Sequence, residues 1–147
     1  CVKISSGYVV GGNGSAADIL GVLNGIFFNA ATTLKPTFSN FYKATITPAN
    51  SEDTTAFVID DPYQQYVVAA DDATGVTTML ETYDMNTSAG SDTTGKSSSS
   101  LDIATTSANG KQFRLLRSAE DPENEDATAA LASVIVVSNL NSFNGHN

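Results

Sequence analysis

Short runs of β-branched and aromatic residues, separated by turn-forming residues, are the feature that most limits what this chain can fold into. The clearest example is Thr55–Asp72, in which the apolar runs Ala56–Ile59 and Tyr66–Ala70 flank the segment Asp-Asp-Pro-Tyr. β-Branched and aromatic residues favour strands, and Asp-Pro cannot continue one, so the stretch predicts a strand, a corner and a second strand. We expect Asp60 to cap this corner by bonding to its own backbone.

The same pattern recurs along the chain and predicts an all-β fold. Further strands are expected at Val2–Ile4, Tyr8–Val10, Leu20–Phe28, Lys43–Thr47, Val76–Tyr83, Leu101–Thr105, Lys111–Arg117 and Val134–Val137. Phe113 and Leu115 would share one face of their strand, whereas the continuous apolar run Val134–Val137 suits a buried central strand. Without a long amphipathic helix, the sequence predicts a single compact β-sandwich or β-barrel of about eight or nine short strands with long polar loops.

Length and composition indicate one domain that ends in a polar tail. A chain of 147 residues with 41 % hydrophobic residues can bury a sizeable core as a single unit. We assign residues 1–138 to the β domain and residues 139–147 to a polar C-terminal tail. Within the domain, nine of the fourteen residues in 87–100 are Ser or Thr, which predicts a long surface loop.

Charge and rare residue types argue against several function classes. The chain has 7 Lys and Arg against 16 Asp and Glu, and a net charge of −9 is the wrong sign for binding nucleic acid or an anionic membrane. The only His, His146, lies in the polar tail, where it cannot be held rigidly beside a Ser as a catalytic triad requires. With one Cys, Cys1, neither an intrachain disulfide nor a Cys-cluster metal site can form. No run of about 18 apolar residues encodes a transmembrane helix.

Carboxylates supply the remaining candidate chemistry. Asp60 and Asp61 are adjacent, as are Asp71 and Asp72, and adjacent strand residues point to opposite faces, so neither pair forms an acid–base couple by itself. The segment Asp121–Asp126 offers many oxygen ligands for Ca²⁺ but lacks the spacing of an EF-hand, which favours a solvated acidic loop. We therefore predict a protein with no catalytic residue, no cofactor and no metal site.

Several segments, taken together and in order, resemble a family of small head proteins of marine tailed bacteriophages, the capsid decoration or cement proteins. Each segment is short, and together they span most of the chain. The resembling segments are Leu20–Phe28, Lys35–Tyr42, Ala56–Pro62, Thr93–Asp102, Gln112–Asp126 and the C-terminal stretch Val134–Asn147.

The resemblance implies a non-enzymatic virion protein that binds the outer surface of the capsid and stabilises it. Its implied partners are the major capsid protein and further copies of itself, as a trimer or at subunit junctions. We expect Phe38, Phe41 and Tyr42 to be the contact residues, because aromatic side chains commonly anchor protein interfaces. The same three residues would serve equally well as the lid of a small core.

Two other functions stay open from the sequence. One is a different virion component, such as a tail or fibre protein. The other is a secreted bacterial β-sandwich that binds glycans or forms surface filaments. Such a protein would be lipid-anchored if Cys1 were the first residue of a processed lipoprotein. The absence of Trp counts against a glycan-binding platform.

Overall fold

The strands of this protein were located in a computed structural model that describes residues 1–12, 19–86, 88, 90–107, 110–123 and 126–142. This part of the chain contains ten strands and two short 3-10 helices, which confirms the predicted all-β class and comes close to the expected strand number. The strands are β1 (Val2–Ser5), β2 (Tyr8–Gly11), β3 (Val22–Asn29), β4 (Pro36–Ser39), β5 (Thr55–Ile59), β6 (Gln65–Ala69), β7 (Thr82–Asn86), β8 (Ser100–Ser107), β9 (Phe113–Ser118) and β10 (Ser133–Ser138); the 3-10 helices are η1 (Ala49–Ser51) and η2 (Val76–Thr78).

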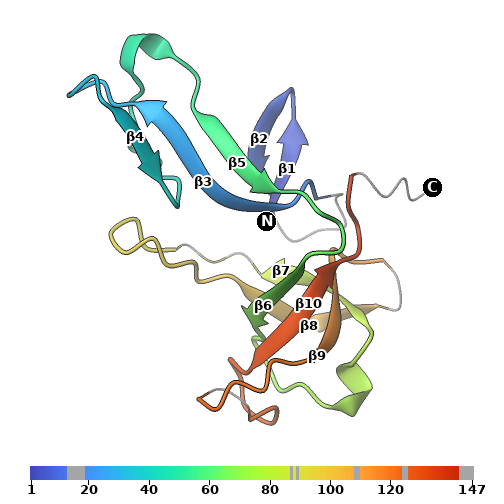
Figure 1. Ribbon diagram of the computed structural model, residues 1–147. Coiled ribbons are helices and arrows are strands. Elements are labelled where there is room, and N and C mark those ends of the chain that lie inside the picture. Colours follow the sequence, from blue (N-terminus) through green and yellow to red (C-terminus); the bar gives the residue numbers. More distant parts are fainter. Residues whose placement is uncertain (13–18, 87, 89, 108–109, 124–125, 143–147) are drawn as a thin grey trace.

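The strands are arranged in three antiparallel sheets (Figure 1). A five-stranded sheet has the order β6-β10-β9-β7-β8, a three-stranded sheet has the order β4-β3-β5, and β1 and β2 form a hairpin. The three-stranded sheet and the hairpin lie at one end of the molecule, and the five-stranded sheet lies at the other. The chain passes between the two ends at the corner after β5.

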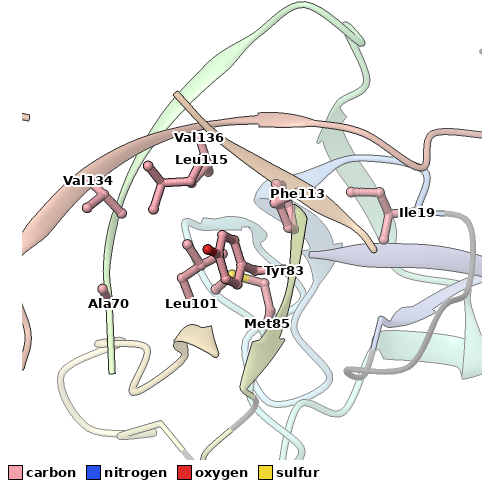
Figure 2. Close-up of a cluster of buried hydrophobic side chains, with 9 residues drawn as sticks. All are labelled: Ile19, Ala70, Tyr83, Met85, Leu101, Phe113, Leu115, Val134 and Val136. Carbon is pink, nitrogen blue, oxygen red and sulfur yellow. The ribbon is translucent and has the colours of Figure 1, made fainter. Parts of the chain in front are cut away.

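The five-stranded sheet curls until its two outer strands meet. Ala70, just after β6, forms a parallel bridge with Leu101 in β8, and the amide of Asp71 donates to the carbonyl of Leu101 at 3.0 Å. Closure of this kind removes exposed strand edges and encloses a core. The buried cluster inside comprises Ile19, Ala70, Tyr83, Met85, Leu101, Phe113, Leu115, Val134 and Val136 (Figure 2).

Two sequence predictions for this core are confirmed. Phe113 and Leu115 lie on the same face of β9, and both side chains are buried. β10 is an interior strand between β6 and β9, as its apolar run indicated. Val134 and Val136 of that strand are fully buried, while the alternate residues on its other face are only half-buried.

The barrel also buries one ion pair that the sequence did not indicate. The Asp84 carboxylate in β7 lies 2.9 Å from the Lys111 ammonium group, and only 3 % of the Asp84 side chain is exposed. A buried carboxylate is costly unless it is paired. Lys111 precedes β9 and Asp84 lies in the adjacent strand β7, so the pair ties two neighbouring parts of the barrel together.

The corner in Thr55–Asp72 joins the two large sheets. The predicted strands are present as β5 and β6, but they belong to different sheets and do not pair with each other. The prediction that Asp60 caps the corner is wrong: the Oδ1 atom of Asp61 accepts the amide of Tyr63 at 2.8 Å, and the Asp61 carbonyl accepts the amide of Gln64 at 3.2 Å. Asp61 occupies the first position of the turn, from which a carboxylate reaches the amide two residues later.

Tyr66 fastens this corner to the barrel core. Its hydroxyl donates to the carbonyl of Ile59 at the end of β5, at 3.4 Å. Its ring meets Phe113 edge-on, with ring centroids 6.3 Å apart. The pKa of Tyr66 is raised above its usual value. Burial of the hydroxyl is the main cause, and the negative charges of Asp61 and Asp60 add to it. The neutral phenol is therefore the favoured form, and it can donate this hydrogen bond.

Three further predictions need correction or comment. Lys43–Thr47 is a turn rather than a strand, because Pro36–Ser39 takes the place beside β3 as β4. Val76–Tyr83 is not one strand, since η2 occupies its first residues and β7 begins only at Thr82. The start of the predicted polar tail is held in place: the carbonyl of Leu140 accepts the amide of Ile19, and the remainder, 143–147, lies outside the described residues.

Truncation of the barrel core should lower stability strongly. We expect Leu115→Ala to reduce the free energy of unfolding by about 2–5 kcal/mol, because the side chain is fully buried and its removal leaves a cavity. The matched control is Leu131→Ala, since Leu131 is 62 % exposed and should change stability little. Urea unfolding measures both values, and equal effects would contradict the assigned core.

The corner offers a second comparison between neighbouring residues. We expect Asp61→Ala to lower the free energy of unfolding by about 0.5–1 kcal/mol, because the bond to the Tyr63 amide is lost. Asp60→Ala should have a smaller effect, since the structure gives the Asp60 side chain no such bond. Thermal unfolding of the two variants distinguishes the two residues, and a larger effect at Asp60 would restore the original prediction.

Candidate interaction surfaces on the three-stranded sheet

One face of the three-stranded sheet collects exposed aromatic residues. Phe27 in β3 lies opposite Phe38 in β4, and Gly25 in β3 lies opposite Phe57 in β5. Residues opposite each other across strands share a face, as do alternate residues along one strand, so the three phenylalanines lie together. Their exposed fractions are 38 %, 61 % and 45 % for Phe27, Phe38 and Phe57. We refer to these three residues as the aromatic face.

Gly25 makes the contact within the aromatic face possible. A Cβ atom at Gly25 would lie 2.5 Å from the tip of the Phe38 ring, so only glycine leaves room for that ring. Phe38 thereby reaches across β3 to Phe57, with ring centroids 5.9 Å apart and planes tilted by 49°. Tilted aromatic pairs at this distance attract each other, which fixes the two rings as a unit.

Polar groups lie next to the aromatic face. The side-chain amide of Asn29, at the end of β3, donates to the Glu52 carboxylate at 3.1 Å, and Thr55 on β5 lies opposite Phe27. An apolar centre with a polar rim is the usual make-up of a protein–protein interface.

The opposite side of the same sheet borders a groove of about 1060 Å³. Its apolar lining includes Leu23 and Ile26 of β3 and Ala56 of β5, which lie on the face away from the aromatic residues. Further lining comes from β2, from the segment after β4 and from the Ser/Thr-rich loop. Among the described residues in this lining, Asp53 has the only acidic or basic side chain; Cys1, whose α-amino group is largely buried, also lines the groove. Burial lowers the pKa of that amino group.

The Ser/Thr-rich loop packs against Phe41 rather than standing free. Gly95 has a φ of +69°, and a Cβ atom there would lie 2.5 Å from the Phe41 ring. The loop also closes on itself, because the amide of Gly95 donates to the carbonyl of Ser91 at 2.8 Å. The Lys43 ammonium group lies over the Phe41 ring, 5.2 Å from the ring centroid. In Figure 1 the loop runs between the three-stranded sheet and the barrel.

The structure separates the three predicted contact residues. Phe38 lies on the aromatic face, whereas Phe41 and Tyr42 line the groove, with Phe41 half-buried and Tyr42 57 % exposed. Phe27 and Phe57 are the members of the aromatic face that sequence reasoning missed. Their exposure could have been suspected only if the strand register had been known, because alternation alone does not say which face is covered.

The candidate carboxylates bond mainly to nearby backbone. Asp71 accepts the amide of Ile103 at 2.9 Å, Asp72 accepts that of Ala73 at 2.7 Å, and Asp121 accepts that of Glu123 at 3.1 Å. Asp126 accepts both the hydroxyl and the amide of Thr128, and these bonds lower the pKa of Asp126. Each of these carboxylates thus accepts a backbone hydrogen bond within the fold.

Metal and triad chemistry gain no support from the described residues. Among them, no three His, Cys, Asp or Glu side chains gather in a way that could hold a metal ion. Two residues of the acidic loop, at 124–125, lie outside the described residues, and so does His146. No helix in the described ranges has the length and apolar character needed to cross a membrane.

Comparison with known proteins adds no relative. No family model, no curated protein and no solved structure matches this chain.

The fit between Gly25 and Phe38 can be tested by a double-mutant cycle. We expect Gly25→Ala to lower the free energy of unfolding by about 1–3 kcal/mol, because the added methyl group overlaps the Phe38 ring. In a Phe38→Ala background the same change should cost less, since the ring that it displaces is gone. Urea denaturation of the four proteins measures the coupling, and additive effects would show that the ring does not occupy this space.

Proposed function

We propose that this chain is a non-enzymatic virion protein that binds the outer surface of a capsid and stabilises it, as a decoration or cement protein does. The proposal joins two lines of support. The order of resembling segments supplies the class of protein, and the aromatic face supplies a surface suited to protein binding. The major capsid protein is the proposed partner, with further copies of this chain at neighbouring positions.

The exposed aromatic face is the observation that carries the binding role. Phe27, Phe38 and Phe57 remain substantially exposed although each could bury about 150–250 Å². Clustered exposed aromatics with a polar rim are characteristic of surfaces that become buried in a complex. The rings of Phe38 and Phe57 already contact each other, so binding would cost them less side-chain entropy than it would cost rings without a neighbour.

The barrel suits a stabilising role on a particle. Its core and the closure between β6 and β8 give a rigid base, from which the three-stranded sheet projects (Figure 1). A rigid binder that attaches only to the assembled capsid stabilises that assembly by mass action.

Removal of the aromatic face should abolish particle binding while leaving the barrel intact. We expect the triple variant Phe27→Ser, Phe38→Ser and Phe57→Ser to bind capsids of the encoding phage at least about 100-fold more weakly, because each lost anchor is worth about 1–2 kcal/mol or more. Co-sedimentation with purified capsids lacking the protein gives the affinity and the number of bound copies. Tyr63→Ser is the matched control, since Tyr63 is 83 % exposed but lies at the corner, away from this face.

The possible results test the capsid-binding role and the assignment of the contact to the aromatic face separately. Wild-type protein that does not bind the particles would overturn the capsid role, and binding of an oligosaccharide through the same phenylalanines would then support a glycan-binding protein. Tight capsid binding by the triple variant would keep the role but move the contact elsewhere.

A further inference from the structure

The outer edge of β2 is free of backbone partners in the described part of the chain. β1 and β2 are joined by Ser6 and Gly7, whose φ values of 51° and 84° fit a two-residue hairpin turn of type I′. In such a hairpin, Ser5 and Tyr8 exchange both of their backbone hydrogen bonds, and bonded and non-bonded pairs then alternate along the strands.

This alternation fixes which groups of β2 point away from β1. Val9 lies opposite Ile4, and Gly11 lies opposite Val2, and both are non-bonded pairs. In this alternation Cys1 and Gly12 form a hydrogen-bonded pair, and the Gly12 amide does donate to the Cys1 carbonyl, at 3.1 Å. The amides and carbonyls of Val9 and Gly11 therefore point outward from the hairpin.

The corresponding outward groups of β1 form hydrogen bonds with another segment of the chain. The amide of Val2 donates to the carbonyl of Gly21 at 2.9 Å, and the Val2 carbonyl accepts the amide of Leu20 at 2.8 Å. β1 thus receives an extended segment along its outer edge. β2 presents the same pattern of groups, and within the described residues its edge receives no strand.

The free edge of β2 borders the apolar groove. Gly7 and all four residues of β2 line the groove, which fits a strand that presents its edge as well as a side-chain face to it. Across the groove lie Ile26, which is buried, and the half-buried Leu23 and Ala56. At about 1060 Å³, the groove is larger than most small-molecule sites, which span roughly 300–1,000 Å³.

The charge of the lining narrows the class of ligand. Among the described residues that line the groove, Asp53 is the one with a charged side chain; it is exposed and has no hydrogen bond or ion pair with any described residue. A ligand with a single positive charge can pair with it, whereas an acidic ligand would be repelled both by Asp53 and by the net charge of −9.

We propose that this groove binds an extended, mostly apolar segment of a partner protein, which adds to the edge of β2 as a new strand and places a Lys or Arg beside Asp53. Main-chain bonds to Val9 and Gly11 supply affinity, as in other cases of strand addition, and the half-buried Leu23 and Ala56 contact alternate side chains of the segment. A small apolar ligand could fill the groove but would leave the edge groups of β2 unpaired. The binding site is distinct from the aromatic face and does not depend on a capsid role.

The test begins with a selection of random peptides displayed on phage against the immobilised full chain. We expect enriched peptides that alternate apolar and other residues, contain one Lys or Arg and lack Pro in their centre. Synthetic copies of an enriched peptide then serve as the probe, with affinity measured by isothermal titration calorimetry.

Substitutions in the groove separate strand addition from simple apolar binding. Val9→Pro should weaken the peptide by about tenfold or more, because it removes an outward amide while the hairpin bonds of Tyr8 and Val10 remain. Val9→Thr, which keeps both the amide and the β-branched shape, is the matched control and should bind nearly as the wild type does. Asp53→Asn should weaken the basic peptide but not an analogue with Gln in place of its Lys or Arg.

A second measurement does not depend on how the variants fold. Peptides carrying N-methyl groups on alternate residues should lose binding in one of the two registers only, because a strand added to an edge presents every second amide to it. Equal loss in both registers, or in neither, would overturn strand addition. So would a selection that enriches no peptide, enrichment of acidic peptides, or binding abolished by Phe38→Ser rather than by Val9→Pro. Concentration-dependent self-association that Val9→Pro abolishes would assign the groove to a second copy of this chain and would equally overturn the proposal.

Discussion

The closure of the five-stranded sheet is the constraint on which the rest of this structure depends. The meeting of Ala70 and Leu101 turns an open sheet into a barrel, and the cluster of buried hydrophobic side chains packs inside it. The three-stranded sheet has no comparable core, since Ile26 is the only residue of its strands that is both hydrophobic and fully buried. Its position therefore depends on attachments to the barrel, through the corner at Asp61, the Tyr66 hydroxyl and the pairing of Ile19 with the segment after β10.

This uneven distribution of burial explains why both candidate surfaces lie on the smaller sheet. A sheet with one face on a core needs only one apolar face, but this sheet carries phenylalanines on one side and aliphatic residues on the other. Its own fold covers neither side completely. Apolar surface that folding leaves exposed carries a solubility cost, which a binding function would offset.

Local sequence patterns located most of the strands but not their partners. Val134–Val137 and the alternation of Phe113 with Leu115 identified core strands because burial acts on each side chain separately. The corner at Asp61-Pro62 was predicted for the right reason, yet nothing local showed that β5 and β6 enter different sheets. Lys43–Thr47 has the alternation of a strand, but Pro36–Ser39 pairs with β3 instead, which is a choice between competing long-range contacts. The aromatic face was only partly predictable for the same reason, since Phe27 and Phe57 are brought beside Phe38 by register alone.

The glycines show how closely backbone and surface are linked in this sheet. Glycine weakens a strand when it lies in the middle, as Gly25 does in β3. Its lack of a side chain leaves room for Phe38 to contact Phe57. Gly95 does the same for Phe41 in the Ser/Thr-rich loop, where a positive φ also favours glycine. In both places a residue that adds nothing to the core allows an aromatic ring to be held in one position. Rings that are fixed before a partner arrives lose less entropy on binding, so these glycines suit a sheet whose two sides remain available for contact.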